Sequence, residues 1–115
     1  MAEIPREYWE PTKEKWEKIK EKVKNGEKFV NSYGFEDLTV MARCGYCYYF
    51  SPGCFKRLIG SSCSLYNKRV CCSEYKRSFV FYQFVDEMQK DKPDFEVALE
   101  FAQKILDAIN EDTPI

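Results

Sequence analysis

Six cysteines lie in the middle of this 115-residue chain, and they are the residues best suited to do chemistry. They occur in the order Cys44-x2-Cys47-x6-Cys54-x8-Cys63-x7-Cys71-Cys72, with no cysteine elsewhere. The Cys44-Gly45-Tyr46-Cys47 run has the spacing of a zinc knuckle, in which a tight turn points two thiolates at one tetrahedral ion. Gly45 would relieve the backbone of that turn. A complete site needs two further ligands, which would come from the pair Cys71-Cys72 and from Cys63 or Cys54.

Several chemistries fit this cluster. The knuckle spacing favours a structural zinc site with four cysteine ligands, but an iron–sulfur cluster also takes four thiolates. Six is an even number, so disulfides remain an alternative, although their pairing does not follow from sequence. The Lys- and Glu-rich, Gln-poor composition is typical of proteins from hot-growing organisms, where intracellular disulfides occur. The vicinal pair Cys71-Cys72 is the candidate for a redox-active role.

Residue types that are missing narrow the function further. The chain has no histidine, which excludes the Ser-His and Cys-His dyads of common hydrolases and any His-ligated catalytic zinc. It has no glycine-rich phosphate loop and no paired carboxylates at a motif-like spacing. We therefore predict a non-enzymatic protein.

The cysteine segment is also the basic part of a chain whose net charge is −1. Residues 42–80 contain seven Lys and Arg side chains and a single acidic one, and many Tyr and Phe lie among them. Aromatic rings stack on bases and cations neutralise phosphates, so this segment predicts a nucleic-acid surface. The candidates for phosphate contacts are Arg43, Lys56, Arg57, Lys68 and Arg69. Alternatively, the rings pack around the cysteines and the cations offset the negative charge of four thiolates.

The elements that must position these residues are mainly helical. We expect one domain, 1–115, with a loose lead-in over 1–11. A helix capped by Thr12 would run to about Asn25, with an apolar stripe of Trp16, Ile19 and Val23. Leu38–Met41 predicts a short strand that leads into the first cysteine.

After the cysteine-rich centre, 42–72, we expect loops with a helical turn near Phe55–Ile59 to give way to a helical hairpin over 73–110. Ser73 would cap its first helix, and Asp91–Asp94 would break it. The last helix would cover Phe95–Asn110, with a stripe of Ala98, Phe101, Ala102, Ile105 and Ile109. Residues 111–115 would fray.

The run Phe79–Val85 is apolar on more than one side. We predict a helix here rather than a strand. Such a helix lies in the core or forms the interface of a homodimer.

The pattern Cys44-x2-Cys47, Cys54, Cys63-Ser-Leu and Cys71-Cys72-x2-Tyr75 resembles small uncharacterised cysteine-rich proteins of phages and archaea. Those proteins often show a later Cys followed by Pro-Leu, where Ser64 stands here, and a shorter gap before it. The resemblance covers about a quarter of the chain, and it implies a metal-binding fold and no particular activity.

These observations predict a fold that is mainly α with little β, in which three or so helices surround an irregular cysteine-rich centre. The function we predict is a binding module with a cysteine-ligated zinc that binds nucleic acid or another protein. A disulfide-stapled protein–protein adaptor and an iron–sulfur or redox protein are the alternatives. The chain has no long apolar run and no apolar region near Met1, so we expect a cytoplasmic protein without a membrane partner.

Overall fold

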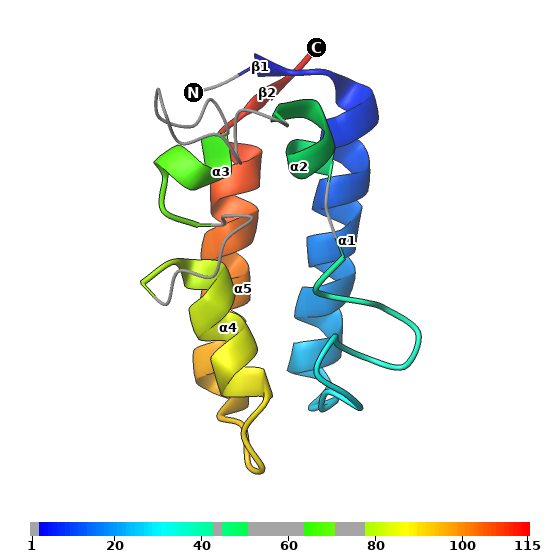
Figure 1. The fold of residues 1–115 in the computed structure, drawn as a ribbon, viewed down its shortest axis with the longest axis vertical. Helices are drawn as coiled ribbons and strands as arrows, with labels where there is room; N and C mark the ends of the chain where they lie inside the picture. The colour runs from blue at the N-terminus through cyan, green and yellow to red at the C-terminus, as the bar shows by residue number, and fades with distance from the viewer. Residues whose placement is uncertain (1–2, 43–44, 51–63, 71–77) are drawn as a thin grey trace.

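The computed structural model describes residues 3–42, 45–50, 64–70 and 78–115 (Figure 1). Its helices are α1 (Arg6–Lys24), α2 (Gly45–Phe50), α3 (Ser64–Asn67), α4 (Val80–Met88) and α5 (Phe95–Asn110). Its strands, β1 (Glu3–Ile4) and β2 (Thr113–Pro114), have two residues each. The predicted fold class, mainly α with little β, is confirmed.

Helix α1 begins at Arg6, so the predicted loose lead-in over 1–11 is wrong for the residues that the structure describes. Pro5 occupies the N-cap, and its carbonyl accepts the backbone N–H groups of Tyr8 and Trp9. Thr12 is therefore not a cap. It lies buried inside the helix and donates its hydroxyl to the Tyr8 carbonyl, 2.9 Å away. Pro11 lies inside the helix on its exposed side, where its missing N–H leaves one intrahelical hydrogen bond unmade.

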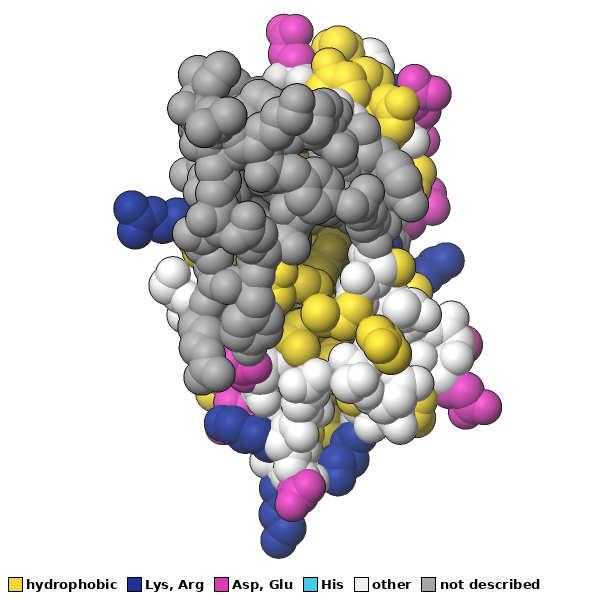
Figure 2. Space-filling model, in the orientation of Figure 1, with side chains coloured by type: hydrophobic (Ala, Val, Ile, Leu, Met, Phe, Trp, Pro, Cys, Tyr) yellow, Lys and Arg dark blue, Asp and Glu magenta, His cyan; other side chains and the backbone are white. Residues whose placement is uncertain are grey.

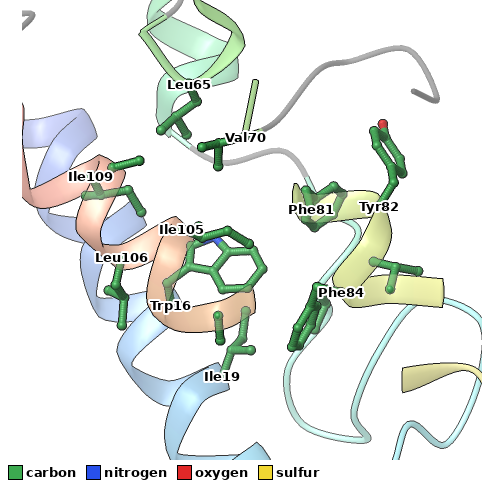
Figure 3. Close-up of a cluster of buried hydrophobic side chains, with 14 of the residues drawn as sticks. Trp16, Ile19, Leu65, Val70, Phe81, Tyr82, Phe84, Ile105, Leu106 and Ile109 are labelled. Carbon is green, nitrogen blue, oxygen red and sulfur yellow. The ribbon is translucent and has the colours of Figure 1, made fainter. Parts of the chain in front are cut away.

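The core forms where α1 and α4 pack against α5. The predicted stripes of α1 and α5 are buried, apart from the half-buried Phe101. Figure 3 shows Trp16 of α1 beside Ile105 of α5 and facing Phe81 and Phe84 of α4. The Trp16 ring meets those of Phe81 and Phe84 edge to face, with centroids 5.9 and 5.4 Å away. Such aromatic pairs are favourable beyond the area that they bury.

Helix α4 confirms the helical interpretation of Phe79–Val85. Its described part starts at Val80, after Phe79, whereas the predicted cap Ser73 lies outside the described residues. Phe79, Phe81, Phe84 and Val85 are buried within this one chain. The segment therefore belongs to the core, and a homodimer through it stays a prediction.

The turn between α4 and α5 follows the predicted break. The Asp94 carboxylate accepts the backbone N–H groups of Glu96 and Val97, which caps α5. Glu87, buried near the end of α4, accepts the backbone N–H of Asp94 and the Lys90 ammonium, each at 3.0 Å. The backbone N–H first, and then the ammonium, lower the pKa of Glu87 below its ordinary value.

The connection after α1 contains turns instead of the strand predicted for Leu38–Met41. Gly34, with φ +146°, forms isolated bridges with Asn31 and Thr39. No partner strand lies beside this segment in the described part of the chain, so the pairing stops at single bridges.

The C-terminal residues do not fray, contrary to our prediction. Strand β2 pairs in parallel with β1, with Thr113 opposite Glu3. The Ile115 N–H donates to the Ile4 carbonyl, and the Ile115 carbonyl accepts the Arg6 N–H, both at 3.0 Å. Satisfied backbone groups on both strands thus hold the two ends of the chain side by side (Figure 1).

None of the described helices combines the length and the apolar character that a membrane span requires.

Candidate functional site

The structure describes the residues that flank the cysteines rather than most of the cysteines themselves. Cys47 is part of α2. The other five cysteines lie outside the described residues, as do the candidate cations Arg43, Lys56 and Arg57 and the predicted helical turn at Phe55–Ile59. Helices α2 and α3 replace part of the loop that we predicted for the cysteine-rich centre.

One buried carboxylate joins the flanking residues. Asp112 follows α5, and its side chain is completely buried. Tyr46 of α2 donates its hydroxyl to Asp112 Oδ2 at 2.6 Å, and Ser64 of α3 donates its hydroxyl to Asp112 Oδ1 at 2.9 Å. Tyr46 precedes Cys47 and Ser64 follows Cys63, so two separate parts of the cysteine segment meet at Asp112.

Lys68 completes this cluster. Its ammonium donates to the Ala108 carbonyl at 2.7 Å and to Asp112 Oδ1 at 3.0 Å, and Glu111 lies 3.6 Å away. The opposite charge of Lys68 compensates for the burial of the Asp112 carboxylate. Lys68 was a candidate for phosphate binding, and here its ammonium is engaged inside the molecule. Arg69 is exposed and has a left-handed backbone, with φ +58°.

Helix α1 holds the Cys44–Cys47 segment from the other side. The Gly45 N–H donates to the Thr12 hydroxyl at 2.9 Å. Lys15 donates to the carbonyls of Val40 and Ala42, at 3.0 and 2.8 Å, just before Cys44. The start of α2 is thus bonded to Thr12 of α1, and the chain that leads toward it is bonded to Lys15.

Gly45 is required by close contact with α1. A β-carbon at this position would collide with the Tyr8 carbonyl oxygen and lie 2.9 Å from the Thr12 hydroxyl. The glycine of the Cys-Gly-Tyr-Cys motif therefore serves the approach of two backbones, in addition to any role in a metal-binding turn.

Charge is dispersed on the described surface. Figure 2 shows the Lys and Arg side chains of this face standing singly around the edge of the molecule, with apolar side chains exposed beside the undescribed part. The described residues of this face therefore form no cationic patch by themselves, and a phosphate-binding surface would depend on the other predicted cations.

A hollow of about 450 Å³ lies at the opposite end of the molecule, between the connection after α1 and the α4–α5 turn. Two bonds cross between these segments, from Lys28 to the Asp91 carbonyl at 2.6 Å and from Gln89 to the Ser32 carbonyl at 3.1 Å. The cation Lys90 at its rim is paired with Glu87. The polar groups around the hollow therefore serve to link the two segments.

The sequence alone did not reveal Asp112, Ser64 or Thr12 as members of this site. Asp112 lies in the tail that we expected to fray, and Thr12 was expected to cap a helix. Tyr46 and Ser64 lie within the cysteine motifs and Lys68 was a candidate cation, but nothing in the sequence linked them to Asp112. These partners are brought together by long-range contacts, which local patterns do not report.

The described residues contain no group of three or more Cys, Asp or Glu side chains arranged to hold a metal ion. Comparisons with protein-family models, with curated proteins and with solved structures found no match to the chain.

Proposed function

We propose that this chain is a small non-enzymatic binding module whose central segment is fixed by zinc bound to four of its six cysteines. The observation that supports this proposal is the convergence on Asp112. Tyr46 and Ser64, next in sequence to Cys47 and Cys63, bond to the same carboxylate. The residues next to two cysteines that are distant in sequence are therefore attached to one end of the molecule, as ligation of a shared metal ion would require.

Zinc would supply a crosslink rather than a reaction. A structural zinc site contributes on the order of 10 kcal/mol to the folding of a small domain, which exceeds the roughly 2–4 kcal/mol of one disulfide. Metal-binding thiolates must stay reduced, which suits a cytoplasmic protein. The Cys-x-x-Cys spacing at Cys44 and Cys47 favours zinc over a set of unrelated disulfides.

The partner that we propose is nucleic acid, bound through the cations and rings of the central segment. Lys68 is committed to Asp112, which leaves Arg43, Lys56, Arg57 and Arg69 for phosphate contacts. Binding should therefore weaken as salt rises, because neutralised phosphates release counterions. An affinity that is independent of salt would instead favour a protein partner.

The test is a metal analysis on protein purified without affinity metals, combined with six single Cys→Ser variants. We expect about one zinc per chain. Four variants should lose the metal and two should retain it, because a tetrahedral site uses four ligands.

Other outcomes identify the alternatives. No metal and no free thiols in denaturant would show a disulfide-stapled adaptor. The two cysteines of each disulfide would then give Cys→Ser variants with equal losses of stability. Iron and sulfide with visible absorbance would show an iron–sulfur protein. Six variants that all keep the wild-type metal content and melting temperature would contradict any crosslink through these cysteines.

A further inference from the structure

Burial of the Asp112 carboxylate costs free energy unless hydrogen-bond partners replace the water that it loses. Aspartate is almost never fully buried without partners, and here both carboxylate oxygens accept hydrogen bonds. The three donors come from α2, from α3 and from the residue just after α3. One carboxylate thereby fixes two parts of the central segment relative to the end of α5.

Asp112 is itself rigidly mounted. Its backbone N–H donates to the Ile109 carbonyl at 3.2 Å, directly after α5, and Thr113 next to it pairs with Glu3. Lys68 bonds both Asp112 and the Ala108 carbonyl. The carboxylate therefore has a fixed position to which Tyr46 and Ser64 must adapt.

We propose that Asp112 is a positioning residue for the cysteines. Through Tyr46 and Ser64 its carboxylate sets the relative placement of α2, which contains Cys47, and of α3, which begins directly after Cys63 in the sequence. The part of this inference that concerns metal affinity rests on the proposed zinc site. The part that concerns placement of the segments does not.

Glu87 provides the matched comparison. It is the other buried carboxylate among the described residues, and it also accepts a hydrogen bond from a lysine. Its contacts, however, join α4 to the cap of α5, far in sequence from every cysteine. If Asp112 only stabilised the fold, D112N and E87Q should change zinc affinity and cysteine alkylation to the same extent.

The experiment measures two quantities in wild type, D112N and E87Q. The first is zinc affinity, by competition with a chromophoric chelator. The second is the alkylation rate of Cys47 and Cys63 in reduced, metal-free protein, followed by mass spectrometry. We expect D112N to weaken zinc binding about tenfold, the low end of the effect of losing a partner bonded directly to a metal ligand, because Asp112 acts through the neighbours of the cysteines. D112N should also speed alkylation of both cysteines, whereas E87Q should change neither quantity.

The outcomes separate the two proposals. If the wild type binds no zinc but D112N still speeds alkylation, the proposed zinc site fails and the positioning role stands. If D112N and E87Q bind zinc equally well and alkylate at equal rates, the positioning role is wrong and the zinc site stands.

Milder variants keep the test decisive if D112N does not fold. Y46F and S64A each delete one hydroxyl that donates to Asp112. Y33F deletes a hydroxyl from an exposed ring at the other end of the molecule and is the control. We expect Y46F to speed alkylation of Cys47, and S64A that of Cys63, while Y33F matches the wild type. Three variants with wild-type rates would overturn the proposal.

Discussion

At the end of the molecule that carries both termini, polar contacts join the segments, whereas aromatic packing dominates toward the α4–α5 turn. The carboxylate of Asp112 and the hydroxyl of Thr12 connect α2 and α3 to α5 and α1. Below them, Trp16 and Phe29 surround the fully buried ring of Phe84. The same α1–α5 pair of helices thus supports two different kinds of contact (Figure 1).

The two ends contribute differently to this fold, one mainly to stability and the other to the positions of α2 and α3. Apolar burial is non-directional, so the aromatic end stabilises the domain without dictating a precise geometry. Hydrogen bonds to a buried carboxylate depend on distance and angle, so they dictate where α2 and α3 lie. The proposed metal ligands would need defined positions, and the polar contacts lie next to the cysteines in the sequence.

The largest effect that we predict comes from the aromatic end. F84A removes a completely buried ring and leaves a cavity beside Trp16, so the free energy of unfolding should fall by about 3–5 kcal/mol. Urea unfolding followed by tryptophan fluorescence measures this loss. Zinc affinity of the folded protein should stay at the wild-type value, because no cysteine neighbour is touched.

V30A is the control for F84A, since the Val30 side chain is 61% exposed and should contribute little. A fall in stability for F84A no larger than that for V30A would contradict the assignment of the core to the aromatic end.

A smaller effect on stability, with a change in binding, is expected for G45A at the end with the termini. The new methyl group would collide with the Tyr8 carbonyl and push α2 away from α1, at a cost of about 1–3 kcal/mol. Zinc affinity should fall as well, because the shift moves the Cys44–Cys47 segment.

G26A is the matched control for G45A. Gly26 has φ +78° with no atom near an added β-carbon, so this change should cost about 1 kcal/mol of backbone strain. Zinc affinity should not change in G26A. Equal zinc affinities for G45A and G26A would contradict the prediction that the contact of α2 with α1 positions the zinc ligands.

The smallest effect concerns the one buried carboxylate at the aromatic end. The pKa of Glu87 is lowered in the folded protein, so its contribution is present above the ordinary value of 4.5 and is lost as pH falls through the folded pKa. E87Q should therefore be less stable than the wild type at neutral pH, by about 1 kcal/mol for the lost charged hydrogen bonds.

The stability difference between E87Q and the wild type should shrink below pH 4.5 in urea titrations. A difference that stays constant from neutral to acidic pH would show that the Glu87 charge does not matter.

Local sequence patterns predicted α5 and most of α1, whereas α2, α3 and the start of α1 at Arg6 were missed. The bounds of α5 follow from Asp94 as its cap and from its apolar stripe, and the buried face of α1 follows from Trp16, Ile19 and Val23. Helices close their hydrogen bonds within one segment, so spacing and caps contain most of the information that specifies them.

Predictions failed where a partner from elsewhere in the chain decides the outcome. Residues 111–115 look like a frayed end until β1 is placed beside them, and Pro11 looks like a helix boundary until α1 is packed. Leu38–Met41 has the composition of a strand but finds no strand beside it among the described residues. Pairing and packing of this kind are not encoded in neighbouring residues.

Residue types and their spacing were enough to predict a mainly helical protein and to single out the six cysteines as the candidate site. The attachment of α2 to Asp112 and Thr12 became visible only in the folded molecule. A buried hydrogen bond requires its two partners to meet in space, and Tyr46 and Asp112 are 66 residues apart in the sequence, so no local pattern reports their contact.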